Sequence, residues 1–225
     1  MEIGIIGTGN MGRSLGILWA ERGHAVFFGS REPDKARQAA ELAGRAARGG
    51  TNDEAARFGQ VLLYAVRQPP SEVFTSTDVL DGKVLIDCNN RETPEGFAFE
   101  PPSRPSLAEK VASDVPAARV VKAFNTFAQE VFELSPLPLK EYGVSVFVCG
   151  DDSDARQTVS TLAEDIGFVA VDCGTLRNAW MVEATGDFIR LLIADRGRGP
   201  YATISVRELP RADSERLGGR KSGYK

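Results

Sequence analysis

Three glycines near the start of the chain have the spacing of a nucleotide-binding loop. Residues 7–12 read Gly-Thr-Gly-Asn-Met-Gly, between an apolar run at 3–6 and a helical pattern at 14–22. We expect Gly7 to allow a tight turn, Gly9 to let a diphosphate reach the backbone, and Gly12 to let the helix pack on the strand. The helix N-terminus adds free N–H groups and a partial positive charge. Strand, glycine turn and helix together predict a dinucleotide site, and a purely structural turn is the alternative.

The end of the second apolar run, at 25–28, indicates which dinucleotide is bound. NAD-binding proteins usually place a carboxylate here for the ribose hydroxyl, but this chain has Ser30 and Arg31, with Lys35 four residues further on. A hydroxyl and a guanidinium suit a phosphate group. We therefore predict NADP(H), with these three residues around its 2′-phosphate. The alternative is that Glu32 or Asp34 binds the ribose and Arg31 is only solvated.

Polar residues follow three further apolar runs, where the carboxyl ends of parallel strands would meet. We expect these ends and the glycine turn to surround a nicotinamide. Amide or hydroxyl groups there would hold its carboxamide, and guanidinium groups would attract an anionic substrate. Each also has an ordinary interpretation, as a turn residue or a solvated strand end. The candidates are Val66 and Arg67 at the end of the run at 61–66, Asn89 and Arg91 after 84–88, and Asn125 and Thr126 after 119–124.

The chain offers few groups for acid–base or nucleophilic catalysis. Its one histidine, His24, begins the second strand, at the end opposite to the expected site. The three cysteines lie in or at the end of apolar runs without metal-ligand spacing, so we expect reduced structural thiols and no metal site. Lys122 alternates with apolar neighbours, which is typical of a lysine that reaches a polar edge, and we assign it no catalytic role.

Composition narrows the class of protein. The chain has 225 residues, 42% of them hydrophobic, and a net charge of −4. It has no extended basic tract, so we expect no nucleic-acid partner. It has no apolar run of about 18 residues, so we expect no membrane span. The sequence begins directly on a strand without a signal peptide, and we expect a cytoplasmic protein.

Short, nearly continuous apolar runs alternate with helix signals along residues 1–173. This pattern predicts an α/β fold with a Rossmann-like, doubly wound, mostly parallel sheet whose two faces are covered. Capping boxes at 51–54 and 106–109 mark two helix starts, and 150–153 precedes a third helix at 155–166. We divide the chain into an NADP-binding domain at 1–174, a C-terminal part at 175–210, and a flexible tail at 211–225.

Two segments interrupt this alternation. Residues 91–105 hold four prolines and form a long loop after a strand, either a lid over substrate or a surface excursion without a role. Residues 176–194 are predicted to form one helix, with an apolar stripe for core or subunit contact, and 201–209 a short strand. The stripe comprises Leu176, Trp180, Ala184, Phe188 and Leu191/Leu192.

Four motifs in order give the chain a resemblance to a known family. They are the glycine turn at 7–12, Gly-Ser-Arg at 29–31, Val-Lys-Ala-Phe-Asn-Thr at 121–126 and Cys-Gly-Asp-Asp at 149–152. Over most of residues 1–195 the chain resembles the NADP oxidoreductases that depend on the deazaflavin coenzyme F420, and the cytosolic domain of membrane ferric reductases is similar. The first two motifs are shared with many Rossmann proteins, and the last two are more specific.

The resemblance implies hydride transfer between NADPH and a flavin-like ring, with deazaflavin F420, a flavin or a ferric chelate as the acceptor. Such chemistry needs no protein acid or base. It also implies a homodimer, and a diphosphate held by Thr8, Gly9, Asn10 and Met11. Asn125 follows the ferric-reductase branch, so the acceptor stays open. The alternatives are an imine or carbonyl reductase similar to pyrroline-5-carboxylate reductase, and an NADPH sensor without turnover.

Overall fold

One eight-stranded sheet organises the chain in the computed structural model, which describes residues 1–44, 46–101 and 104–210. The strand order is β3-β2-β1-β4-β5-β6-β7-β8. The first six strands run parallel, and β7 is antiparallel to β6. This is the predicted α/β, doubly wound, mostly parallel fold. The strands are β1 (Glu2–Ile6), β2 (Ala25–Gly29), β3 (Arg48–Gly50), β4 (Val61–Tyr64), β5 (Val84–Asp87), β6 (Arg119–Lys122), β7 (Ser145–Gly150) and β8 (Val169–Asp172).

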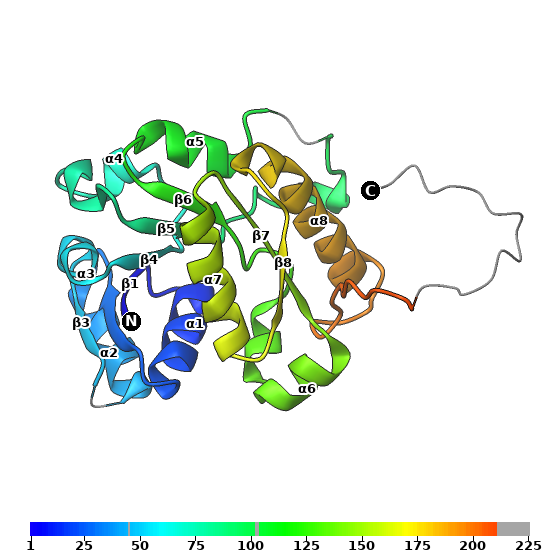
Figure 1. The fold of residues 1–225 in the computed structure, drawn as a ribbon, viewed down its shortest axis with the longest axis horizontal. Helices are drawn as coiled ribbons and strands as arrows, with labels where there is room; N and C mark the ends of the chain where they lie inside the picture. Colours follow the sequence, from blue (N-terminus) through cyan, green and yellow to red (C-terminus); the bar gives the residue numbers. More distant parts are fainter. Residues whose placement is uncertain (45, 102–103, 211–225) are drawn as a thin grey trace, which may run out of the picture.

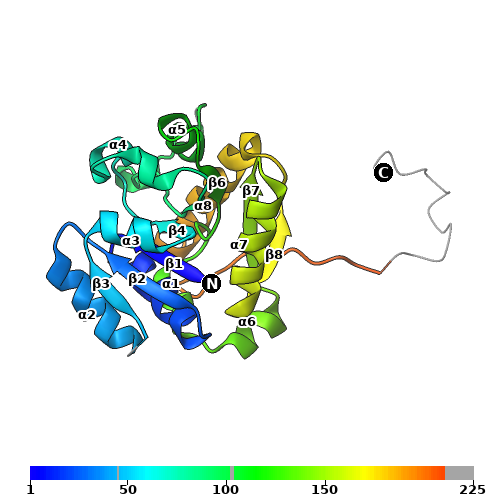
Figure 2. The ribbon, with the colours of Figure 1, turned by 60° about the vertical axis from the view of Figure 1, so that its left-hand side comes forward.

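Helices cover both faces of the sheet (Figures 1 and 2). One core lies beneath the first, second and seventh helices, and a second core lies beneath the third and fifth. Strands β1, β4 and β5 are covered on both faces, which agrees with their nearly continuous apolar sequences, interrupted only by Glu2 and Asp87 at strand ends. The helices are α1 (Asn10–Glu21), α2 (Pro33–Ala43), α3 (Asn52–Phe58), α4 (Pro70–Val73), α5 (Leu107–Asp114), α6 (Pro136–Tyr142), α7 (Ser153–Asp165) and α8 (Ala179–Arg190).

The predicted helix starts are confirmed. Both capping boxes form, at Thr51 with Glu54 and at Ser106 with Glu109. The Asp152 side chain accepts a hydrogen bond from the Ala155 N–H at 2.7 Å and so caps α7. Each cap satisfies backbone donors that a helix start leaves unbonded.

Trp19 ties the first helix to the rest of the core. Its indole is fully buried, and its Nε1–H donates to the Leu162 carbonyl on α7 at 3.0 Å. The ring also packs edge-on against Phe124, with 5.7 Å between centroids. Phe124 follows β6, so this contact links the start of the chain to the turn that carries Asn125.

One of the two predictions for the C-terminal part is wrong. Residues 201–209 form no strand, because they meet the sheet only at the start of β7, through isolated bonds such as that from the Ser145 N–H to the Ile204 carbonyl. The helix predicted at 176–194 forms as one unbroken helical segment, with a 3-10 turn (Leu176–Asn178) before α8 and a π-helical turn (Leu191–Asp195) after it. The predicted tail at 211–225 lies outside the described residues.

The apolar stripe of the last helix is also not its buried face. The side of α8 that packs on the protein is formed by Ala179, Val182, Gly186 and Ile189. Phe188 is 54% exposed and Met181 is 45% exposed. Of the stripe, Leu176 is therefore core and Phe188 is not, and a role of the stripe in subunit contact stays a prediction. No helix in the described ranges has the length and apolar character that a membrane crossing requires.

Candidate active site

The glycine turn forms as the spacing predicts. Gly7 has φ +97°, a left-handed conformation that suits glycine. A Cβ on Gly12 would lie 2.0 Å from the Gly7 carbonyl oxygen, so only glycine fits where α1 crosses the turn. At Gly9, by contrast, a Cβ would meet no described atom within 4 Å. The fold thus needs Gly7 and Gly12, whereas the open space above Gly9 fits a ligand that approaches the backbone.

The N-terminus of α1 has the character of an anion site. Gly9 is its N-cap residue, no side chain caps the helix, and its first turn holds no acidic residue. The N–H groups of this turn are therefore available to a ligand, and the helix dipole favours a negative charge. A dinucleotide's diphosphate fits this arrangement.

The residues predicted for the 2′-phosphate follow β2. Arg31 is exposed, and within the described ranges its side chain forms no ion pair. Ser30 accepts a hydrogen bond from the Glu32 N–H at 3.1 Å, and Lys35 is paired with Glu32 at 2.7 Å. Arg31 is thus the cation that is ready for a phosphate, while Lys35 must first leave its partner.

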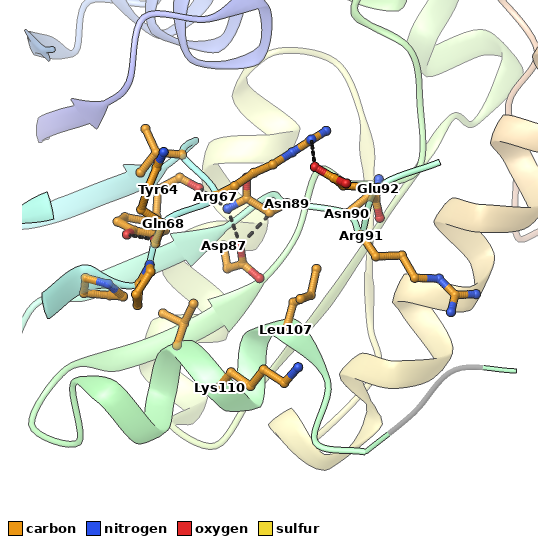
Figure 3. A pocket seen from close by; sticks show the side chains of 14 residues that line it. Tyr64, Arg67, Gln68, Asp87, Asn89, Asn90, Arg91, Glu92, Leu107 and Lys110 are labelled. Carbon is orange, nitrogen blue, oxygen red and sulfur yellow. Dashed lines mark hydrogen bonds and ion pairs between the residues drawn. The ribbon is translucent and has the colours of Figure 1, made fainter. Parts of the chain in front are cut away.

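Two cavities meet at the carboxyl ends of the parallel strands. The α5 cavity, of about 530 Å³, lies between the ends of β4 and β5 and the helix α5 (Figure 3). The α1 cavity, of about 360 Å³, lies between the glycine turn and the end of β6. They share three lining residues, Arg67, Asn89 and Asn90. Their joint position, next to the point between β1 and β4 where the strand order reverses, is where sheets of this topology bind ligands.

The predicted site residues divide between these cavities. Val66 lines the α5 cavity, and Gly9, Asn10, Met11 and Asn125 line the α1 cavity, with Arg67 and Asn89 in both. Thr126 is buried and is not part of either lining. Ser30, Arg31 and Lys35 lie outside both, as expected for the adenosine end of an extended dinucleotide.

The turn after β6 holds Asn125 rigidly. Phe124 is buried with φ +62°, a conformation that is uncommon for a residue other than glycine. The Asn125 Nδ2 donates to Asn90 Oδ1 and to the Val182 carbonyl, both at 3.0 Å. In return, Asn90 Nδ2 donates to the Asn125 carbonyl at 2.6 Å. Asn90 was not among the predicted site residues, although it directly follows Asn89.

The expectation that Lys122 reaches a polar edge is wrong. Its side chain is fully buried beside Asp87, with 2.9 Å between Nζ and Oδ2, and 3.2 Å from Glu183 Oε1. Glu183 also accepts hydrogen bonds from the first N–H groups of α5, at Leu107 and Ala108. Burial alone would lower the pKa of Lys122, but Asp87 and Glu183 hold it above its ordinary value. This ammonium is therefore unsuited to proton transfer.

Burial disables the other nucleophile that lines the site. Cys88 borders the α1 cavity, and burial raises the pKa of its thiol to about 12. A neutral thiol is a poor nucleophile. His24 lies at the amino end of β2, paired with Asp165 at 3.2 Å, away from both cavities.

Charged residues of α8, which were not among the predicted site residues, hold the start of the loop at 91–105. Asp187 accepts a hydrogen bond from Arg91 Nε at 2.6 Å and pairs with Arg190. Arg190 donates to the Arg91 carbonyl and to Thr93 Oγ1, at 2.8 and 2.7 Å, and borders the α1 cavity. In Figure 3, Arg91 points away from the α5 cavity toward α8. These contacts join residues that lie far apart in the sequence, so no local pattern predicts the network.

Replacing Asp187 by alanine is therefore expected to loosen this loop. The substitution leaves Arg91 and Arg190 close together without their shared carboxylate, at a cost of about 2 kcal/mol of unfolding free energy. Urea denaturation measures that cost, and limited trypsin digestion at Arg91 reports loop opening. Asp34→Ala, which removes the exposed partner of Arg37, is the control. Equal stability and equal digestion in the two variants would contradict the role of the network.

Comparisons with known proteins agree with this geometry. Residues 2–91 match the family model described as NADP oxidoreductase, coenzyme F420-dependent. The F420-dependent NADP reductase of Methanothermobacter thermautotrophicus is 33% identical, over 93% of this chain and 96% of that protein. This chain belongs to that family. This membership agrees with the resemblance that the motifs at 7–12, 29–31, 121–126 and 149–152 carry.

Two further relatives place the chain within the family. A solved structure from Arthrobacter sp. FB24, described as an F420-dependent NADP-reductase, superposes with a TM-score of 0.78 at 25% identity, over 92% of this chain and all of that one. Metalloreductase STEAP3 of Rattus norvegicus is 35% identical over 81% of this chain. The chain spans only 36% of that metalloreductase. The relatives of this chain thus differ in the electron acceptor that their names state.

Proposed function

We propose that this chain transfers a hydride from NADPH to a flavin-like acceptor, a deazaflavin such as F420 or a flavin, with a ferric chelate as a further oxidant of the reduced flavin. The observation that carries the proposal is the continuity between the glycine turn and the joined cavities. Gly9, Asn10 and Met11 form the anion site at the N-terminus of α1 and also line the α1 cavity. The same cavity is lined by Asn89 and Asn125. A dinucleotide held at the turn therefore extends its nicotinamide toward these amides.

The protein's own contribution is binding and orientation. The N–H groups of α1 hold the diphosphate, Ser30 and Arg31 with Lys35 hold the 2′-phosphate, and Asn89 and Asn125 orient the carboxamide. When bound, NADPH supplies two electrons and one hydrogen as hydride. The acceptor ring takes that hydride and one proton from solvent, and NADP⁺ is released. Because the cofactors carry this chemistry, the buried Lys122 and Cys88 need not exchange protons.

The lining of the α5 cavity supports an acceptor with an apolar ring and an anionic group. Val66, Pro69, Leu107 and Val111 supply apolar surface, and Lys110 adds a cation. Arg67 lies where the two cavities meet, paired with Glu92 at 3.3 Å. An acceptor ring in this cavity would lie next to a nicotinamide in the α1 cavity.

The test is NADPH oxidation with a panel of acceptors: deazaflavin F420, FMN, FAD, and ferric citrate with and without flavin. We expect turnover with at least one ring acceptor, and ferric reduction only when a flavin is present. Gly9→Ala is the matched control, because it keeps the fold but obstructs the diphosphate. No turnover with any acceptor, or equal turnover by Gly9→Ala, would contradict the proposal.

We further propose that two copies associate through the exposed side of α8, where Met181 and Phe188 present apolar surface. Light scattering of the purified protein should then give twice the chain mass, and Phe188→Glu should give a single chain. An unchanged monomeric mass in both proteins contradicts this assembly.

A further inference from the structure

The Asn89 side chain has a fixed orientation between the two cavities. Its Nδ2 donates to Asp87 Oδ1 at 2.7 Å and to the Tyr64 carbonyl at 3.0 Å. A primary amide has two N–H donors, so both are used. Its Oδ1 receives no hydrogen bond from the described residues and is not enclosed by them. The site thus presents an amide oxygen, which is an acceptor, to any ligand that reaches Asn89.

The Asp87 carboxylate decides which way this amide points. Besides Nδ2, its Oδ1 accepts the backbone N–H of Asn89 at 3.1 Å. A carboxylate only accepts hydrogen bonds, so it must face the NH₂ end of the Asn89 amide. Figure 3 shows the two side chains joined on the α5 cavity. The amide oxygen is consequently turned away from Asp87.

Lys122 keeps the Asp87 carboxylate charged and fixed in position, as this orientation of the Asn89 amide requires. The two residues are direct neighbours on β5 and β6, and both are fully buried. Nζ donates to Asp87 Oδ2, to the Asn89 carbonyl and to Glu183, which accounts for all three ammonium hydrogens. Without this cation, Asp87 would be a buried carboxylate lacking a counter-charge.

We propose that Lys122 and Asp87 are positioning residues, which set the Asn89 amide so that its oxygen accepts a hydrogen bond from the carboxamide NH₂ of the nicotinamide. The inference rests on the proposed function. It adds that recognition at this point depends on a hydrogen-bond donor of the ligand, and that two fully buried side chains determine that dependence. A ligand that carries a methyl group in place of the NH₂ loses the bond.

The experiment compares the Kd of NADP⁺ with that of its 3-acetylpyridine analogue, which keeps the carbonyl but lacks the NH₂. Wild type should bind NADP⁺ about 3- to 10-fold more tightly than the analogue. This ratio should fall to about 1 in Asn89→Ala, in Lys122→Met and in Asp87→Asn. The last variant is isosteric and offers an NH₂ group to Asn89, which turns the amide over. Asp87→Asn therefore tests the proposal even if Lys122→Met does not fold.

Lys83→Met is the matched control. The Lys83 ammonium also donates to buried carbonyls, of Ala56 and Gly59, but it lies at the opposite end of the sheet. This variant should keep the wild-type ratio, and every variant should keep its preference for NADP⁺ over NAD⁺, since that depends on Arg31.

The outcomes separate the two proposals. No NADP⁺ binding by wild type would overturn the proposed function and this inference together. Two results would overturn the inference alone. Wild type could bind NADP⁺ and the 3-acetylpyridine analogue equally well, or Asp87→Asn could keep the wild-type preference for NADP⁺ over the analogue. A purely structural role for Lys122 predicts weaker binding of both ligands with the ratio unchanged.

Discussion

Gly12→Ala is expected to destabilise the protein by about 3 kcal/mol. The added Cβ would lie 2.0 Å from the Gly7 carbonyl oxygen, which belongs to the backbone and cannot rotate away. Helix α1 must therefore move off β1, and the buried packing of Leu15 and Trp19 loosens with it. Chemical denaturation measures the loss, and a circular dichroism melt gives an independent value.

Gly9→Ala supplies the contrast three residues earlier. A Cβ there meets no described atom within 4 Å, so we expect a stability loss under about 1 kcal/mol. NADPH affinity should nevertheless fall at least about tenfold, since the methyl group occupies the path of the diphosphate. If Gly12→Ala were as stable as Gly9→Ala, our account of the turn's packing would be wrong.

Arg31→Ala is expected to weaken NADPH binding about 10- to 100-fold while leaving NADH binding nearly unchanged. A charge-assisted hydrogen bond to phosphate is worth about 1.5–3 kcal/mol, and 1.4 kcal/mol corresponds to tenfold. Arg31 is exposed and, in the described part of the chain, holds no competing carboxylate, so the whole interaction is available to the ligand. Fluorescence titration with both nucleotides measures the two affinities.

Arg37→Ala is the control for this titration, because Arg37 is an exposed arginine on α2 that is already paired with Asp34 at 2.6 Å. It should bind NADPH like wild type. Equal losses for NADPH and NADH in Arg31→Ala would show that the guanidinium does not discriminate the 2′-phosphate. Lys35→Ala should have a smaller effect, because Lys35 must break its bond to Glu32 before it can bind a phosphate.

Local signals in the sequence were sufficient for much of the fold. The glycine turn, the capping boxes and the long apolar runs each depend on residues within one turn or strand, and all are confirmed. The exception among the strands is β3, which reads Arg-Gly-Gly and carries no apolar pattern. At Gly49, a Cβ would lie 2.4 Å from the backbone of Ala36, so close packing against α2 replaces the usual apolar signal.

The error on Lys122 has a clear physical origin. Its neutralising partners come from residues 35 positions before it and 61 positions after it, and only the register of β5 against β6 brings Asp87 beside it. A lysine at an alternating position is ordinarily at a polar edge. The order of apolar and polar residues within β6 does not show which residue of β5 lies beside Lys122. The proposed positioning role of Lys122 could therefore not be predicted from the sequence.

The C-terminal helix shows a similar limit. Glu183, Asp187 and Arg190 contact the site because α8 packs across α5 and the end of β6, an arrangement that helical periodicity does not encode. Gly186 marks this approach, since a Cβ there would lie 2.5 Å from Asn90 Oδ1. Periodicity alone favoured the bulky stripe through Trp180 and Phe188, but Trp180 is only half-buried and Phe188 is exposed.

A crystal structure of the protein soaked with NADPH would test the central claim most directly. We expect the diphosphate on the first N–H groups of α1, above Gly9, the 2′-phosphate beside Ser30 and Arg31, and the nicotinamide in the α1 cavity. Finding the nucleotide elsewhere, or finding the turn without a phosphate at saturating NADPH, would contradict the account.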